Sequence, residues 1–310
     1  MFIAVTSMNK IAASLATHLA GVQEVAQEYA SALLLPAQLL CGLFAFIYIG
    51  LGLWGAWARG QKIDFYRLLR PFSVGLIVTF FAGFVSLLQL CIYPLELATS
   101  SLNESVADHY VQAQDGYQQT TIRIRDAMAT YQRSQVDDAN QEEMNHLLEN
   151  ETSSSYLETY KTVLNLLVSY SSLALTGMVY FFRTYVVLAG VVLLLIGPFA
   201  FALSLLPGFS DNIKNWVTHY VHIAMYVPLS LLVSFMVAVL FSECVYPVFT
   251  DMLSELPQGN YTFADYEQAE NLQLSILHIT LLFNSIAIAL YACIPVFAKW
   301  ILRNDSKKDA

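Results

Sequence analysis

Long apolar stretches separated by short polar ones form the main pattern of this chain. Four stretches have the length of roughly 20 residues or more that a helix needs to cross the hydrocarbon of a bilayer; they lie at 33–57, 72–93, 221–241 and 272–301. A fifth, at 163–206, contains a single charge in 44 residues. Only 13% of the chain is charged, against roughly 25% in soluble domains. The pattern predicts an all-α integral membrane protein.

The positions of lysine and arginine predict how the chain crosses the membrane. Cytoplasmic loops are enriched in these residues. In this chain lysine and arginine gather in two places, and residues 243–271 contain neither. Both basic places should therefore be cytoplasmic and the N-terminus external, which requires an odd number of crossings between 160 and 206. We assign 185–206 as that crossing, for five in total, and leave a sixth through 163–182 open. The basic residues are Arg59, Lys62, Arg67 and Arg70 in the first loop, and Lys299, Arg303, Lys307 and Lys308 at the end.

Four regions follow from this pattern. Residues 1–30 form an amphipathic external helix, with apolar side chains at intervals of three or four. Residues 31–94 hold the first two crossings, and Pro94 should stop the second. Residues 95–160 are polar and acidic and predict an extra-cytoplasmic helical loop, with helix-compatible stretches at 121–132 and 141–149, which rests on its neighbours. Residues 161–310 hold a long helix, the remaining crossings and the tail. The apolar side chains of the first region are Ile11, Leu15, Leu19, Val22, Ala26, Tyr29 and Leu33.

Polar residues inside the apolar stretches are the candidate functional positions. Five of them share one helical face between 163 and 183, and this stripe faces a lumen, water or a partner, or else supplies hydrogen bonds between helices. Arg183 alternatively extends its charge to the membrane surface. His278 and Asn284 lie inside the last crossing and are weak pore candidates. The stripe consists of Asn165, Ser169, Ser172, Thr176 and Arg183.

Catalytic and metal-binding patterns are absent from the sequence. It contains no Gly-rich phosphate loop and no His-Glu-x-x-His motif, and His219 and His222 supply only two ligands. The basic clusters lack the interleaved aromatics of single-stranded nucleic-acid grooves. We expect no enzymatic activity, cofactor or metal. The four cysteines are interpreted as small buried hydrophobes, with a Cys91–Cys244 disulfide as the alternative.

The stretch 196–229 reads IGPFAFALSLLPGFSDNIKNWVTHYVHIAMYVPL. Gly197–Pro198 should kink the crossing, Pro207–Gly208 should end it, and Trp216 should anchor the following polar loop at the membrane interface. This arrangement resembles the TrbL-like polytopic inner-membrane subunits of type IV secretion systems, and in particular the TraJ proteins of conjugative transposons. The layout of five crossings with a large external loop after the second is similar as well.

The resemblance implies a location, partners and a role. The chain would be a multi-pass protein of the bacterial inner membrane, with a periplasmic N-terminus and a cytoplasmic C-terminus, that assembles as a homo-oligomeric ring. It would contact periplasmic stalk or pilus proteins, scaffold subunits, ATPases and lipids, and support the transit of DNA or protein without sequence-specific binding. Gly197, Pro198 and Trp216 would shape the helical bundle, and the acidic loop would meet the stalk. The alternative hypothesis is a small-molecule transporter or channel.

Overall fold

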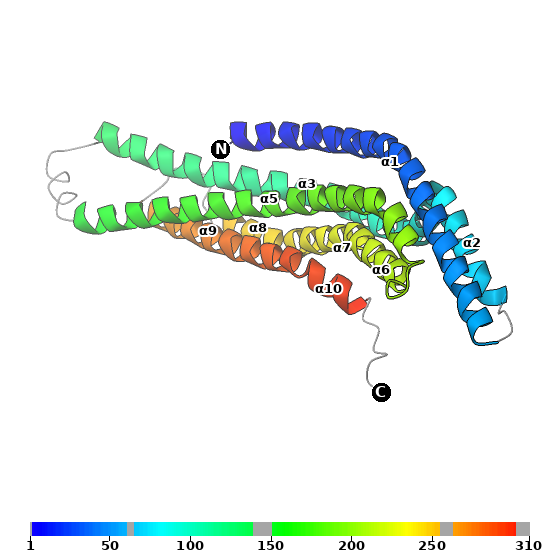
Figure 1. The fold of residues 1–310 in the computed structure, drawn as a ribbon. Helices are drawn as coiled ribbons and strands as arrows, with labels where there is room; N and C mark the ends of the chain where they lie inside the picture. Colours follow the sequence, from blue (N-terminus) through cyan, green and yellow to red (C-terminus); the bar gives the residue numbers. More distant parts are fainter. Residues whose placement is uncertain (1, 61–64, 139–150, 255–262, 302–310) are drawn as a thin grey trace. The chain divides into compact units, whose positions relative to one another are not determined.

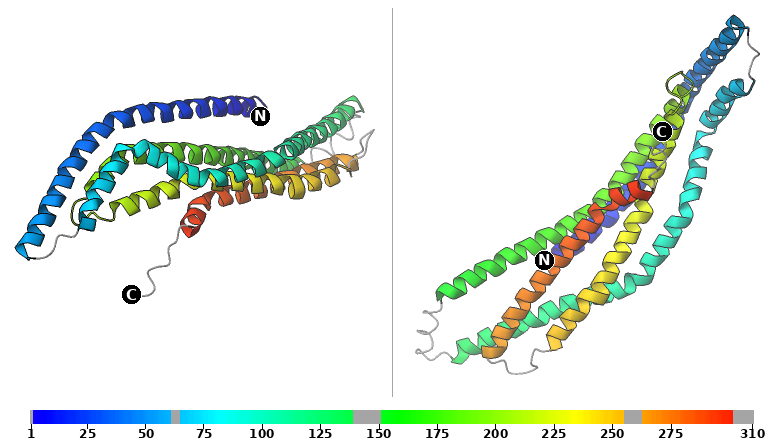
Figure 2. Two further views of the ribbon diagram at one scale, coloured as in Figure 1. Left: turned by 90° about the vertical axis from the view of Figure 1, so that its right-hand side faces the viewer. Right: turned by 90° about the horizontal axis from the view of Figure 1, so that it is seen from below.

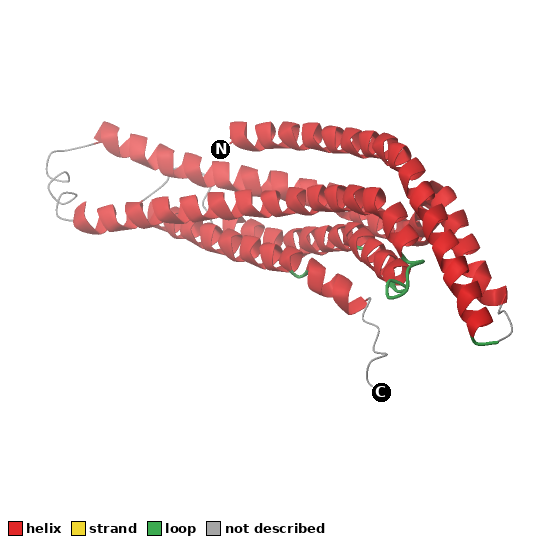
Figure 3. Ribbon diagram, viewed as in Figure 1, coloured by secondary structure: helices red, strands yellow, loops and turns green. Residues whose placement is uncertain are grey.

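The chain is described by a computed structural model that covers residues 2–60, 65–138, 151–254 and 263–301. Within these residues the structure is helix apart from short turns, and it contains no strand (Figure 3). The prediction of an all-α protein is confirmed. The helices, in chain order, are α1 (Phe2–Ala58), α2 (Phe65–Thr79), α3 (Phe81–Asp138), α5 (Glu151–Leu203), α6 (Asn212–Ala224), α7 (Tyr226–Val239), the π-helix η1 (Leu240–Val245), α8 (Tyr246–Ser254), α9 (Phe263–Ala292) and α10 (Ile294–Ile301).

Five segments of the described chain are long and apolar enough to cross a membrane, which confirms the predicted number. Residues 163–182 and the predicted crossing that follows them belong to one uninterrupted helix, α5. A separate sixth crossing would need a turn between them, and none exists there. The five segments are Ala32–Ala58, Phe81–Thr130, Glu158–Leu203, Asn212–Met252 and Glu267–Ile301.

Two predicted helix boundaries are wrong. Pro94 lies inside α3, which continues to Asp138, so most of the region predicted as an external loop is one helix with the preceding crossing. The N-terminal helix likewise continues through Pro36 into the first crossing as α1. A proline removes one backbone hydrogen bond and bends a helix, but a long apolar helix with packed neighbours tolerates that loss. The predicted stretch at 141–149 lies outside the described residues.

The chain divides into two compact units. The first comprises residues 1–97, 180–229 and 295–310, and the second comprises 98–179 and 230–294. One of these divisions falls close to the expected boundary at 94–95, but the expected region 161–310 is shared between both units. The long helices α3 and α5 each contribute one part to each unit.

Apolar and aromatic side chains form the core of the first unit. The second half of α1 runs beside α2 (Figure 1). Around Trp216 the rings of Phe81 and Phe201 pack edge to face, with centroids 5.4 and 5.3 Å from the indole. Such pairs contribute about 0.5–1.5 kcal/mol beyond the burial of their area. The other buried members are Ala37, Cys41, Val74, Val78, Val85, Ala202, Leu205 and Tyr220.

In the second unit, the part of α3 from residue 98 onward and the first part of α5 pack against residues 230–254 and 263–294. The first part of α5 and α9 run side by side (Figure 2) and enclose Leu164, Val168 and Leu277. The π-helix η1 places Phe241 against Phe283, with ring centroids 5.2 Å apart. A π-helix inserts an extra residue into the turn and rotates the side chains that follow.

All four cysteines are free thiols. Cys91 and Cys244, which formed the hypothetical disulfide, are both exposed. Cys91 belongs to the first unit and Cys244 to the second, and the disulfide between them stays a prediction. Cys41 alone among the four is buried, so the interpretation of the cysteines as small buried hydrophobes holds for that residue.

Candidate functional site

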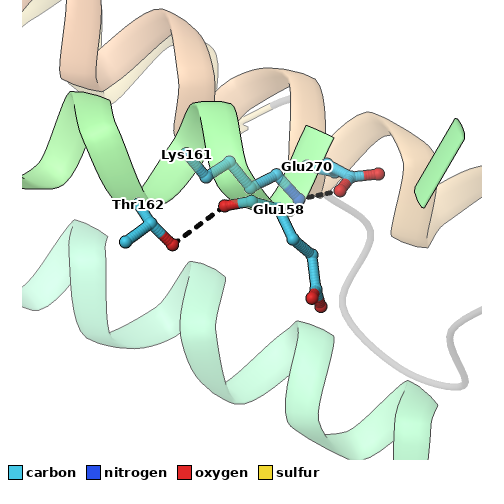
Figure 4. A network of polar contacts seen from close by, with 4 residues as sticks. All are labelled: Glu158, Lys161, Thr162 and Glu270. Carbon is cyan, nitrogen blue, oxygen red and sulfur yellow. Dashed lines mark hydrogen bonds and ion pairs between the residues drawn. The ribbon is translucent and has the colours of Figure 1, made fainter. Parts of the chain in front are cut away.

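A seam of polar contacts joins α5 to α9 in the second unit. At one end, Lys161 forms an ion pair with Glu270, and both side chains are largely covered (Figure 4). The next residue of α5, Thr162, donates its hydroxyl to the carbonyl of Glu158, one turn back in the same helix, at 2.9 Å (Figure 4). The hydroxyl of Tyr160 lies 2.8 Å from Nε2 of His278. His278 is thus exposed but engaged with a neighbouring helix.

The centre of the seam is Asn284, which is buried in α9. Its Nδ2 donates to the hydroxyls of Ser171 and Ser172 on α5, each at 2.9 Å. A polar amide within an apolar helix pair is costly unless its donors are satisfied, and both hydroxyls serve that purpose. Asn284 therefore holds two helices together here.

The third helix of the seam is α3, which meets α9 through a hydroxyl pair. Thr280 and Tyr117 have their hydroxyl oxygens 3.3 Å apart. Tyr117 also packs on Phe249, with ring centroids 5.1 Å apart. The backbone of α3 comes close at this level because Gly116 has no side chain: an added Cβ would collide with the ring of Tyr246.

The predicted polar stripe on α5 is divided between two environments. Ser172 bonds to Asn284 across the helix pair, and the Thr176 hydroxyl donates to the carbonyl of Ser172 in its own helix at 2.9 Å. Asn165, Ser169 and Arg183 are exposed. The interpretation as hydrogen bonds between helices therefore holds for Ser172, and the lumen- or partner-facing role of the stripe stays a prediction.

The Gly197 to Trp216 stretch lies in the core of the first unit. Helix α5 passes through Gly197–Pro198 and ends at Leu203, and the turn that follows contains Gly208 at φ +96°, in the left-handed region that favours glycine. The helix thus ends four residues before Pro207, and Pro207–Gly208 belongs to the turn that follows it. Trp216 is 5% exposed and donates its indole N–H to the carbonyl of Leu193 at 3.1 Å.

The prediction of Trp216 as an interface anchor is therefore wrong. The polar residues that precede Trp216 suggested a loop, but residues from Asn212 onward form helix α6, which turns the indole inward. Gly197 makes room for it, because a Cβ at this position would collide with Phe81 and lie 2.9 Å from the indole.

Sequence reasoning missed a structural role for Arg70. Its Nη2 donates to the carbonyls of Ser204 and Ser210 at 3.4 and 3.3 Å, so it binds both ends of the turn after α5. The last carbonyls of a helix have no partner within the helix, and a guanidinium satisfies them well. In the sequence, Arg70 was only one of the basic residues that indicate a cytoplasmic loop. No local pattern indicates that it binds the carbonyls of Ser204 and Ser210, which are far away along the chain.

Metal-ligating groups do not converge anywhere in the described part of the chain. His222 of α6 instead has its Nε2 3.0 Å from the hydroxyl of Tyr226, the first residue of α7. The polar contacts of the seam are hydrogen bonds and one ion pair between helices. Their chemistry suits holding and orienting helices within or beside a membrane.

Comparison with known proteins provides one match. Residues 11–155 match the model of a family described as homologues of TraJ from Bacteroides conjugative transposon. No curated protein and no solved structure matches the chain. The stretch 196–229 lies outside the matched residues, so the TrbL-like likeness based on it stays a prediction. The resemblance to the TraJ proteins of conjugative transposons is confirmed over residues 11–155, a match that links the chain to conjugation, and its five long apolar helical segments indicate a multi-pass membrane protein.

Proposed function

We propose that this chain is an inner-membrane channel or scaffold subunit of a conjugative type IV secretion system. In this role it supports the passage of DNA or protein substrate and the assembly of a pilus or stalk. The family match supports the link to conjugation, and the helices of the second unit support the role as a subunit of a larger assembly.

Helices α3 and α5 are much longer than the hydrocarbon layer is thick. Helix α3 has 58 residues and α5 has 53. At 1.5 Å per residue they extend about 87 and 80 Å, against roughly 30 Å of hydrocarbon. A large part of each helix therefore lies outside the hydrocarbon.

Contacts between the helices indicate which part of α3 and α5 lies in water. Thr280 and Asn284, one turn apart on α9, contact Tyr117 of α3 and Ser171 of α5. These two positions on α3 and α5 thus lie at nearly the same level. Within three turns of Tyr117, α3 exposes four charged side chains, which hydrocarbon would not accommodate. They are Asp115, Arg123, Arg125 and Asp126.

An exposed apolar face on α5 is the observation on which the proposal rests. At this same level α5 exposes a continuous apolar face, whose members are each 48–66% exposed. An apolar face of this kind beside a charged, water-exposed helix is a site for protein contact. A second copy of the chain would cover it and build the proposed ring. The face consists of Val163, Leu166, Leu167, Tyr170 and Leu173.

The proposed orientation follows the basic loops. With the loop after α1 and the C-terminal tail in the cytoplasm, the outer part of α3 is periplasmic, where stalk or pilus proteins would bind it. Scaffold subunits and ATPases would meet the cytoplasmic side. The chain would contact transiting DNA or protein without reading sequence, and it would have no catalytic part in the transfer.

Two measurements test the proposal. Deleting the gene from a conjugative element should abolish transfer, and expression in trans should restore it. In a cysteine-free background, Leu166→Cys on the apolar α5 face should form a cross-link between copies in cells that carry the transfer genes. Gln119→Cys, exposed on the polar side of α3, is the matched control and should not.

The outcomes separate the parts of the proposal. Unchanged transfer after deletion contradicts a role in conjugation. Loss of transfer without a Leu166→Cys cross-link contradicts the ring contact and leaves the role itself intact. Solute flux through liposomes that contain this protein alone would favour the small-molecule transporter instead.

A further inference from the structure

A groove in the first unit has the form of a lipid site. It has a volume of about 470 Å³, within the roughly 300–1,000 Å³ of small-molecule sites. Helix α3, helix α5 and the α6–α7 segment each contribute one wall. Most of the lining is aliphatic, including Val187, Val191 and Leu194. An apolar groove beside hydrocarbon excludes water and fills with an apolar chain.

Three of the polar side chains that line the groove are engaged with the protein. Gln89 and Tyr220 share a side-chain hydrogen bond, and the hydroxyl of Ser86 donates to the carbonyl of Ala82 at 3.0 Å. These groups do not present a polar binding surface within the groove. The interior therefore suits a hydrocarbon chain better than a polar solute.

One end of the groove carries charges of both signs. Phe81 of α3 meets Gly197 of α5. From this contact both helices run along the groove toward the same end, α3 with increasing residue numbers and α5 with decreasing ones. Glu96, which lines the groove, is 15 residues from Phe81 along α3, and Arg183 is 14 residues from Gly197 along α5. At 1.5 Å per residue both lie roughly 21–23 Å from the contact, so they share one level.

Arg183 lies on the face of α5 that lines the groove. The positions 183, 187, 190 and 194 follow one another at intervals of four, three and four, and the last three of these line the groove. The Arg183 side chain is exposed and makes no hydrogen bond or ion pair with the described part of the chain. It is thus placed to bind a ligand at the mouth.

We propose that this groove binds one membrane phospholipid with a primary-ammonium headgroup, such as phosphatidylethanolamine. An acyl chain lies along Val187 and Leu194, Arg183 binds the phosphate, and Glu96 binds the ammonium. A guanidinium pairs with phosphate through two parallel hydrogen bonds, and a carboxylate accepts hydrogen bonds from an ammonium. Phosphatidylglycerol lacks the cation, and the quaternary ammonium of phosphatidylcholine has no N–H to donate.

Gly190 provides the variant that fills the groove. It lines the groove, and an added Cβ would have no atom within 4 Å, so Gly190→Leu occupies the space without a collision at its Cβ. Gly177 lies on the same helix away from the groove and is equally open. Gly177→Leu is therefore the matched control for the gain in helix propensity.

The test uses the full chain, purified in detergent and incubated with equal amounts of phosphatidylethanolamine, phosphatidylcholine and phosphatidylglycerol with identical acyl chains. Native mass spectrometry counts the lipids that stay bound. The wild type and Gly177→Leu should retain one phosphatidylethanolamine, and Gly190→Leu should lose it. Glu96→Gln should reduce the preference over phosphatidylglycerol about fivefold, the factor that one charge contributes near a membrane surface.

Three results would overturn the proposal. The first is equal retention by Gly190→Leu and Gly177→Leu. The second is retention that does not depend on the headgroup in the wild type. The third comes from cells, where a photo-reactive side chain at Val187 should yield a lipid adduct: a protein adduct there would show that a partner helix occupies the groove. The wild-type headgroup preference and the response of Glu96→Gln do not depend on whether Gly190→Leu folds.

Discussion

Gly197 shows how a single missing side chain determines the packing of the first unit. The indole of Trp216 and the ring of Phe81 occupy the space where a Cβ at position 197 would be. The indole also satisfies its N–H on the carbonyl of Leu193, one turn before Gly197 in the same helix. Backbone and indole thus approach closely, and a larger residue at 197 would separate them.

The Gly197→Ala variant should therefore be destabilised. Forcing a methyl group into a packed core costs about 1–3 kcal/mol, which outweighs the roughly 1 kcal/mol that alanine gains over glycine in a helix. Gly177→Ala, in the same helix with open space around it, should be neutral or stabilised. Thermal unfolding in detergent measures both. Equal shifts of the two variants would contradict the packing at Gly197.

Asn284 shows what the sequence could and could not indicate at the residue scale. It is a weak pore candidate in the sequence because polar groups are costly inside a crossing, and the structure buries it against two serines of α5. Only Ser172 belonged to the predicted stripe. Ser171 was missed because the rotation of α5 about its own axis depends on the leucines that pack on α9, and periodicity in one helix cannot show which face its neighbour takes.

At the scale of elements, the sequence indicated where helices lie but not where they end. The five crossings follow from hydropathy together with the positions of lysine and arginine. Pro94 was misleading, because it lies inside α3 as Pro36 lies inside α1 and Pro198 inside α5. A proline ends a helix only when nothing else favours its continuation, whereas Pro207 with Gly208 adds a left-handed backbone that α-helix does not permit.

The end of α5 depends on a residue from another element, Arg70. Replacing it with glutamine removes a charge-assisted contact to the carbonyls of Ser204 and Ser210. Because the site is partly exposed, we expect a loss of about 1 kcal/mol, which is roughly a fivefold faster amide exchange in the 204–211 turn. Hydrogen exchange by mass spectrometry measures this directly.

Arg59→Gln is the control for Arg70→Gln. It removes the same charge from the same basic region, and Arg59 is exposed and contacts no carbonyl in the described structure. Its exchange at 204–211 should match the wild type. Faster exchange in both variants would show that the charge of the region, and not the contact of Arg70, protects the turn.

At the scale of the whole molecule, the two units differ in what their helices expose. The first unit contains the amino-terminal part of α3, whose apolar residues suit hydrocarbon, and the second contains the part of α3 that exposes charges. The sequence indicated this change of environment near residue 95. It did not indicate that α5 also contributes to both units, because 163–206 is apolar throughout, and hydropathy cannot separate a lipid-facing surface from a protein-facing one.

The membrane topology gives the last prediction, and it concerns the entire chain. Cytoplasmic loops carry Lys and Arg because these residues resist translocation, so the region after α1 and the C-terminal tail should share the cytoplasm. Single cysteines in a cysteine-free background report this without removing any charge. Ala58→Cys and Ser306→Cys should react with an impermeant maleimide only after the inner membrane is permeabilised, and Gln119→Cys should react in intact cells. If Ala58→Cys and Ser306→Cys react from opposite sides, the number of crossings is even, and the periplasmic assignment of the outer part of α3 then depends on which end moved.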